Sequence, residues 1–378
     1  MNVDAQDDSS VTKAARRIVS VDALRGFDMF WIVGADSLVA GLRQVSDHPV
    51  VGTVAEQLEH VPWTGFHFYD LIFPLFVFLM GVSAVFSLGR TKREGDVRKA
   101  YWRLFKRSAL LIGLGIFYYG ALQRDDGPEQ YRFVGVLQRI GICYFFSGLV
   151  FLNFRAKGIF VVLVLLLGGY WALLSFVPVP EYGAGNFAEG ENLTNYFDSQ
   201  YLPGYKWDGD WDPEGLLSHL PAIGSGLLGL FGGLIIANKS FSGYKKVGLF
   251  VLLGAVCLGA GWAWGHSFPI NKKLWTSSFV LYAGGWSYFL LAFFYLVIDV
   301  WKFSWWARPF VWIGMNPITI YLLGDLVGGY RALVRRVIHQ PVVDAMGNYG
   351  DLVIAVLGLL LAIWIANWMY RRKIFIRI

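Results

Sequence analysis

Apolar residues in this chain gather into long runs that short polar segments separate. Each run is about 18–25 residues long, the length that an α-helix needs to cross the ~30 Å hydrocarbon layer of a bilayer. The pattern predicts an all-α polytopic membrane protein with about ten spanning helices. We expect these spans at residues 18–42, 70–89, 104–122, 133–153, 158–177, 214–237, 246–265, 276–298, 309–327 and 351–370.

Composition agrees with a membrane protein. Hydrophobic residues make up 56% of the 378 residues and charged residues only 16%, whereas a soluble domain carries about 25% charged residues. The two cysteines, Cys143 and Cys257, lie inside apolar runs, so we expect them to pack in the core and not to form a disulfide. The first residues are polar and no cleavage site follows them, so we expect the first span to act as an uncleaved insertion signal.

The basic residues give the predicted spans a direction. Lys and Arg concentrate in the short cytoplasmic loops of membrane proteins, and alternate loops of this chain hold 22 basic residues on one side and nine on the other. This asymmetry predicts that both termini are cytoplasmic, with one transmembrane domain at 18–370 between tails at 1–17 and 371–378. The net charge of +6 therefore reflects topology, and we expect a lipid bilayer and no nucleic acid as a partner.

Two predicted outer loops are long, at 43–69 and 178–213. The first contains His60-Val-Pro-Trp63-Thr-Gly, a turn that leads into the second span. A histidine at a membrane entrance is suited to act as a general base near neutral pH or as a covalent nucleophile, although most histidines in outer loops have no such role. His67 and Asp70 stand three residues apart, a spacing that allows them to pair.

The second long loop is acidic and aromatic. Between Glu181 and Asp212 it has seven carboxylates, one lysine and eight aromatic rings. Such a surface is suited to stack on a sugar ring and to attract a protonated amine, although a structural lid explains it equally well. The run from Asp208 to Glu214 lacks the spacing of a calcium loop, so we expect no metal and interpret Asp212 as the cap of the sixth span.

Ionisable residues inside spans are costly and usually functional. Asp22 and Arg25 share a face of the first helix, either as a structural ion pair or with Arg25 placed to meet an anionic group from the cytoplasm. Asp36 lies about four turns further out and has no basic residue near it in its own helix. We favour an active-site role for Asp36 over a structural hydrogen bond.

Three more polar residues lie in later spans. Arg139 in the fourth span requires a carboxylate or a ligand phosphate as its partner. Asn316 precedes Pro317, which frees a backbone carbonyl in the ninth span, and such breaks often line cavities. Asp325 lies further out on the same span. Together these residues suggest a polar path between the helices.

Seven segments carry a resemblance to a known family when they are taken in order. They are Ser20–Gly26 (SVDALRG), His60–Gly65 (HVPWTG), Asp70–Gly81 (DLIFPLFVFLMG), Gly135–Gly141 (GVLQRIG), Trp211–Gly215 (WDPEG), Asn271–Trp275 (NKKLW) and Gly314–Pro317 (GMNP). On these segments the chain resembles the bacterial relatives of heparan-alpha-glucosaminide N-acetyltransferase, within the transmembrane acyltransferase superfamily.

The resemblance implies transfer of acetyl from cytoplasmic acetyl-CoA to an amino sugar on the far side of a bacterial inner membrane. The active-site histidine of the family falls on His60, and Asp36 stands where the lysosomal enzyme has an asparagine. A small acceptor such as glucosamine or a cell-wall fragment is expected, and a homodimer is implied by the resemblance alone. Direct proton abstraction by His60 and transient acetylation of His60 both remain open.

Each substrate then has a predicted set of residues, with His60 and Asp36 as the catalytic pair. For acetyl-CoA we expect five basic residues and the asparagine at the helix break of the ninth span: Arg25, Arg103, Lys106, Arg107, Arg139 and Asn316. For the acceptor we expect outer aromatic and acidic residues: Trp63, Asp70, Trp211, Glu214 and Asp325.

Two other functions remain open. An amino-sugar permease also uses broken helices and aromatic loops, and a transmembrane O-acyltransferase of envelope polysaccharide shares the cytoplasmic donor but acts on a hydroxyl group. The sequence has no phosphate-binding glycine loop, which argues against ATP-driven transport by this chain alone.

Overall fold

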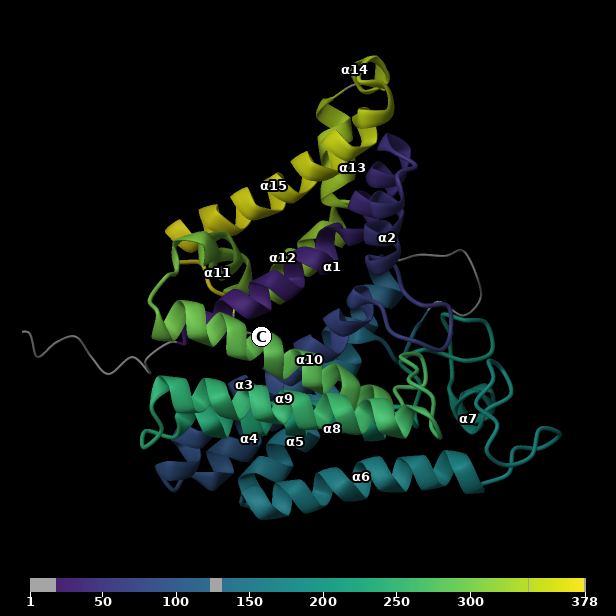
Figure 1. Cartoon of the computed structure of the whole chain (residues 1–378), viewed down its shortest axis with the longest axis vertical. Helices are drawn as coiled ribbons and strands as arrows, with labels where there is room; N and C mark the ends of the chain where they lie inside the picture. Colours follow the sequence, from purple (N-terminus) through teal and green to yellow (C-terminus); the bar gives the residue numbers. More distant parts are fainter. Residues whose placement is uncertain (1–17, 123–130, 339, 377–378) are drawn as a thin grey trace, which may run out of the picture.

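The computed structural model describes residues 18–122, 131–338 and 340–376; the predicted N-terminal tail at 1–17 lies outside them. The described residues form helices joined by loops, and their only β pairing is at two isolated bridges, Arg132 with Gly204 and Val179 with Gly183. The all-α prediction is confirmed, and Figure 1 shows the helices packed along one another.

Seven helices within the described residues are long and apolar enough to cross a membrane, counted with their short 3₁₀ or π extensions. They are α3 (Ile72–Arg93), α5 (Val136–Asn153), α6 (Ala156–Phe176), α8 (His219–Ala237), α9 (Gly243–Gly265), α10 (Ser277–Phe294) and α15 (Gly350–Arg371). The chain is therefore a multi-pass membrane protein.

The other three predicted spans are also helical, but they are more polar or broken. They are α1 (Val19–Val45), α4 (Val97–Phe117) and the pair α11 (Arg308–Gly314) and α12 (Pro317–Leu326). Charged residues interrupt α1 and the first half of α4, and Asn316 separates α11 from α12 as the proline following it predicted. Polar groups are tolerated at such positions where they face a cavity or another helix.

Two helix starts differ from the prediction. The α8 helix begins at His219, so the interpretation of Asp212 as its cap is wrong; Asp212 instead binds Arg132 through two hydrogen bonds of 2.8 and 2.7 Å. The α4 helix begins at Val97, where Asp96 accepts from the backbone N–H of Lys99. Residues expected in a basic loop therefore lie on a rigid helix.

Glycines let the central helices approach closely. A Cβ on Gly81 of α3 would lie 2.1 Å from the carbonyl oxygen of Gly226 on α8, and one on Gly26 of α1 would lie 1.7 Å from that of Phe310 on α11. Only glycine fits such contacts, which bring helix backbones together as small residues do in membranes. They fix α3 and α1 relative to their neighbours, and both helices carry candidate site residues.

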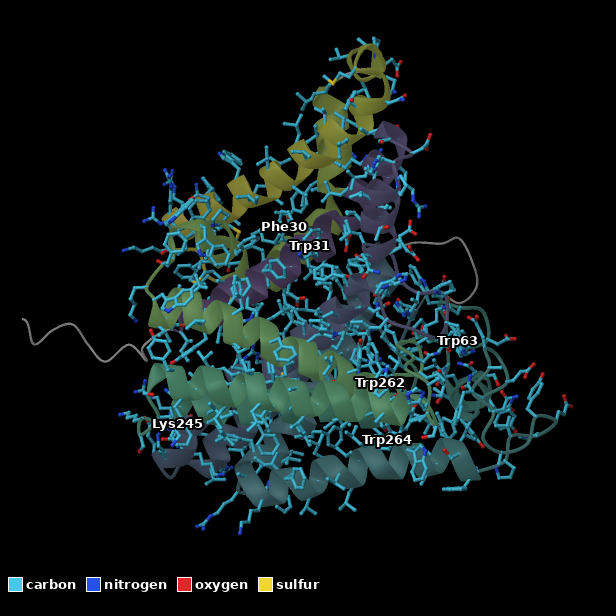
Figure 2. All side chains as sticks on the ribbon, in the orientation of Figure 1. Phe30, Trp31, Trp63, Lys245, Trp262 and Trp264 are labelled. Carbon is cyan, nitrogen blue, oxygen red and sulfur yellow. The ribbon has the colours of Figure 1, made fainter. Side chains whose placement is uncertain are left out.

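The predicted outer segments lie at the right and at the top of the view in Figure 1. Figure 1 shows α7 (Leu193–Tyr201) and the loops around it at the right, whereas α15 and α1 lie side by side in the upper part. Helices α13 (Tyr330–Val337) and α14 (Gln340–Ala345) show that the outer segment 328–350 is largely helical. In Figure 2, Trp63 lies at the end near α7 and Lys245 at the opposite end.

Candidate active site

A basic cavity of about 700 Å³ opens between the helices beside α3, which lines it with Phe76, Met80, Ser83 and Ser87. Arg25, Arg103, Lys106 and Arg107 line it together, and the described residues that line it include no acidic side chain. Arg103, Lys106 and Arg107 are three and four residues apart on α4, so the helix turns them to one face. Four of the six predicted cofactor residues therefore meet in one place.

Arg25 is held in the wall of this cavity. Its Nη1 lies 3.4 Å from Asp22 Oδ1, which confirms the predicted pair, and 3.4 Å from the carbonyl oxygen of Gly314. Its Nη2 donates to Ser83 Oγ at 2.6 Å. Arg107 lies over the ring of Tyr144 at 4.8 Å. Protein groups thus orient Arg25 and Arg107 at the cavity.

Asn316 is buried beside the cavity and binds the C-terminal segment. Its Nδ2 donates to the carbonyl oxygen of Ile374, and its Oδ1 accepts from the backbone N–H of Ile376, both at 2.9 Å. Met315, Pro317 and Ile376 line the cavity, whereas Asn316 does not. Asn316 therefore does not line the cavity itself but holds the C-terminal segment, whose Ile376 does.

His60 and Asp70 form a close pair at the other end of α3. His60 Nδ1 lies 2.8 Å from Asp70 Oδ1, and Asp70 is fully buried at the 3₁₀ turn that leads into α3. The second oxygen, Oδ2, accepts from the backbone N–H groups of Val61 at 3.3 Å and His67 at 3.0 Å. Asp70 does bind His67, as the spacing suggested, but through the backbone; its side-chain partner is His60.

This pair leaves one imidazole nitrogen for chemistry. A carboxylate that accepts from Nδ1–H fixes the tautomer and leaves Nε2 with a lone pair, as in a base-orienter pair. The imidazole stacks on Tyr69 with ring centroids 4.5 Å apart, and 49% of the His60 side chain remains exposed. His60 is thus oriented by buried groups and still accessible.

Lys272 comes from the α9–α10 turn to the same imidazole. Its Nζ lies 2.9 Å from Nε2 and 3.0 Å from Nδ1 of His60, and 3.7 Å from Asp70 Oδ1. Burial and the positive charge of Lys272 lower the pKa of His60 from its usual 6.5, against the hydrogen bond and charge of Asp70 and the charge of Asp36. Burial likewise lowers the pKa of Lys272.

Asp36 lies on the C-terminal half of α1, and its negative charge acts on both His60 and Tyr69. It is exposed in the isolated chain. Asp36 thus acts on His60 through its charge, and the described residues show no hydrogen bond between the two side chains.

Aromatic rings and ion pairs build the loop above His60. Trp63 donates from Nε1 to the carbonyl oxygen of Phe187 at 2.9 Å, and its ring meets that of Trp211 edge-on at 5.6 Å. Lys273 Nζ lies 5.9 and 5.2 Å from these two rings and forms ion pairs with Glu189 at 3.2 Å and Asp208 at 3.0 Å. The loop 178–213 is thereby fastened over the candidate site.

Glu214 and Asp212 both bind Arg132, which the sequence had suggested only as a topology marker. Arg132 Nη2 lies 2.5 Å from Glu214 Oε2, and the guanidinium lies over Tyr119 and Trp207 at 4.7 and 5.1 Å. Asp325, the remaining predicted acceptor residue, binds Tyr118 Oη.

Arg139 lies in the first turn of α5, close to the outer segment 213–218. It donates from Nη2 to Ser218 Oγ and, at 3.2 Å, to the carbonyl oxygen of Pro213, and it lies 4.7 Å from the ring of Trp275. It is fully buried, and its Nε and Nη1 have no hydrogen-bond partner among the described residues. Its neighbour Ile140 lines the basic cavity, but Arg139 does not.

One face of α3 connects the two ends. Ser83, Met80 and Phe76 line the cavity; Phe73 continues this face and packs against Trp275 at 5.0 Å. Asp70 lies three residues before Phe73 in the chain. At a rise of about 1.5 Å per residue, Ser83 and Asp70 are ~20 Å apart along the helix. Phe73, which lies between the cavity residues and Asp70 along the chain, packs with Trp275 and Arg139 in one layer.

Sequence reasoning missed three contributors. Lys272 and Arg132 were both counted among the nine basic residues of the predicted outer loops, Lys272 also lies inside a matched segment, and Ser83 was not selected at all. Local spacing gives no signal for Lys272 or Ser83, because their partners are distant in the chain. The excess of carboxylates over cations in the outer loops was the only hint for Arg132.

Comparisons with known proteins give one family. Residues 17–198 match the family described as heparan-alpha-glucosaminide N-acetyltransferase, catalytic. The human and mouse proteins named heparan-alpha-glucosaminide N-acetyltransferase are 27% and 26% identical to the chain, and each match covers 85% of it. The chain spans about half the length of these relatives, since 56% of each is matched.

Proposed function

We propose that this chain, a relative of the heparan-alpha-glucosaminide N-acetyltransferase family, transfers acetyl from acetyl-CoA across a membrane to the amine of an amino sugar. The observation that carries the proposal is the pair of sites on α3: a basic cavity at one end and the His60–Asp70 pair at the other.

The basic cavity supports binding of acetyl-CoA. The phosphate groups of coenzyme A carry several negative charges, which Arg103, Lys106 and Arg107 are suited to bind by charge-assisted hydrogen bonds. The apolar half of the lining, Phe76, Met80 and Ile140, suits the pantetheine arm. In this arrangement the arm extends along α3, and the thioester reaches His60 when the Phe73 and Trp275 layer opens.

The outer site supports activation of an amine. His60, held by Asp70, takes a proton from the amine as its nitrogen attacks the carbonyl carbon, and the C–S bond then breaks to release coenzyme A. Asp36 near His60 attracts the protonated amine, which loses its first proton to solvent so that a neutral amine reaches His60. Trp63 and Trp211 provide ring faces for the sugar.

The topology follows the charge asymmetry. If α1, α4 and the broken pair α11–α12 cross the membrane together with the seven apolar spans, there are ten crossings and both termini lie on one side, which the basic residues assign to the cytoplasm. The cavity residues then face the cytoplasm and His60 faces the outside, in a bacterial inner membrane. Trp63 and Lys245 at opposite ends of Figure 2 agree with this orientation.

The test is acetyl transfer by the purified chain. With acetyl-CoA and glucosamine, wild-type protein releases coenzyme A and forms N-acetylglucosamine, and His60→Ala abolishes this reaction. His48→Ala is the matched control, because His48 only caps α2 (Pro49–Gln57) and its loss leaves turnover intact. Sugar flux without acetyl-CoA indicates a permease instead, and acetylation of N-blocked sugars indicates an O-acyltransferase.

A further inference from the structure

Lys272 is fastened to the loop that carries His60. The backbone N–H of Gly65 donates to the carbonyl oxygen of Ile270 at 2.9 Å, which joins the two loops two residues before Lys272. Asn271 Oδ1 accepts from the backbone N–H of Leu274 at 2.9 Å and fixes the turn. Only 18% of the Lys272 side chain is exposed. The position of its ammonium group is therefore built into the fold.

A simple ion pair with Asp70 does not explain this position. Lys272 Nζ lies 3.7 Å from Asp70 Oδ1 but 2.9 Å from His60 Nε2. Both oxygens of Asp70 are already bound by His60 and by backbone N–H groups. A cation that served only the carboxylate would lie against the carboxylate. Here it lies against the imidazole, 3.0 Å from Nδ1 and 2.9 Å from the Nε2 that must accept the proton.

We propose that Lys272 is a catalytic residue of the acetyl transfer, which keeps His60 neutral as a base and donates an N–H to the thioester oxygen. This inference rests on the proposed function. His60 alone, as a base, does not stabilise the negative charge that forms on the carbonyl oxygen of the thioester. Lys272 supplies the cation that does.

The transfer moves one acetyl group from sulfur to nitrogen and one proton from nitrogen to sulfur. The amine nitrogen forms a bond to the carbonyl carbon and loses a proton to His60 Nε2, while the carbonyl oxygen becomes an oxyanion beside the Lys272 ammonium. The oxyanion then collapses, the C–S bond breaks, and the thiolate of coenzyme A receives the proton from His60. A fixed cation at the developing oxyanion lowers the barrier because its position needs no reorganisation.

Four groups facing His60 determine its charge. Asp70 and Asp36 favour the imidazolium, Lys272 opposes it, and the stacked ring of Tyr69 removes water from one face. Without Lys272 only burial opposes the two carboxylates, so the pKa of His60 rises and less neutral base is present at a given acidic pH. The direction of this change distinguishes a catalytic lysine from a packing residue.

The experiment compares Lys272→Met with Lys206→Met, a control at a partly exposed lysine of the outer loop. The pKa of His60 is measured by treating the intact protein with diethyl pyrocarbonate, which modifies neutral imidazole, at a series of pH values. The extent of modification of the peptide that contains His60 is then quantified, and this measurement needs no turnover. The expected results for Lys272→Met are a higher pKa and a kcat reduced by about 10²–10³-fold. Lys272→Arg, which keeps the charge, retains the wild-type pKa, and Lys206→Met matches wild type in both measurements.

An unchanged His60 pKa in Lys272→Met overturns the inference, and so does a kcat within about twofold of wild type in an active preparation. A wild-type protein that never transfers acetyl overturns the proposed function, and the assignment of Lys272 as catalytic falls with it. The carbethoxylation measurement still reports separately whether Lys272 controls the charge of His60. The two failures are therefore distinguishable.

Discussion

The two ends of α3 are built in different ways. At one end, four cations surround a cavity of about 700 Å³ that has room for a large ligand. At the other, Asp70 is fully buried and both of its oxygens are bound. A ligand with several charges needs space and several donors, whereas proton transfer needs one fixed geometry. Substitutions at the two ends should therefore change different kinetic constants.

Asp70→Asn is expected to have the largest effect. The amide no longer holds His60 with Nδ1–H toward it, so Nε2 loses its role as the acceptor of the proton. Loss of the corresponding aspartate in a serine-protease triad reduces kcat about 10⁴-fold, and we expect about 10³-fold or more here, with KM for acetyl-CoA unchanged. Asp47→Asn in the same outer loop is the control, and a rise in KM alone would contradict the comparison.

Removal of cations at the cavity should act on binding instead. Arg107→Met leaves one phosphate-binding group absent, and a lost hydrogen bond to a charged group costs about 1.5–3 kcal/mol, so KM for acetyl-CoA rises by about 10–100-fold. The kcat at saturating acetyl-CoA stays near wild type. Arg98→Met, on the same helix but outside the cavity lining, serves as the control. Equal kinetics of the two variants would remove Arg107 from the donor site.

Asn316→Ala sharpens the comparison because it acts at the cavity through the tail. The change removes both hydrogen bonds to the backbone of Ile374 and Ile376, and the wall that Ile376 provides is released. We expect KM for acetyl-CoA to rise about fivefold, equivalent to about 1 kcal/mol. Limited proteolysis after Arg371 should accelerate in parallel. A protected tail with normal KM would show that the segment needs no support from Asn316.

Lys273→Met should have the smallest effect. It removes the ion pairs with Glu189 and Asp208. Such partly exposed pairs stabilise a fold by only about 0–1 kcal/mol. We expect KM for the amino sugar to rise by about threefold, with the kinetics for acetyl-CoA unchanged. Acceptor titrations at saturating acetyl-CoA measure this change. A large loss of kcat would indicate that Lys273, like Lys272, belongs with the reacting groups.

The sequence predicted the helices well because apolar runs and proline breaks are local signals. Asn316-Pro317 divides a helix as expected, and Asp22 pairs with Arg25 at the predicted spacing of three. The start of α8 was predicted five residues early, since Asp212, Pro213 and Glu214 have the composition of a first helical turn. The Arg132 guanidinium, more than seventy residues away in the chain, binds Asp212 instead.

The candidate site was predictable in its parts but not in its pairing. His60 and Asp70 were both selected, yet the spacing favoured His67 as the partner of Asp70. The loop returns on itself, so His67 contributes its backbone and His60 its ring. Lys272 reaches the same imidazole from 212 positions further along the chain. No local pattern encodes such a contact, because it depends on how α9 and α10 pack beside α3.

The most direct test of the two-ended arrangement is acetyl transfer across a sealed membrane. Inverted vesicles that contain the protein are loaded with glucosamine, and labelled acetyl-CoA, which does not cross the bilayer, is added outside. The two-ended arrangement predicts that labelled N-acetylglucosamine accumulates inside the vesicles, and that His60→Ala abolishes it. Labelled product that forms only when both substrates are outside would contradict a donor site and an acceptor site on opposite sides of the membrane.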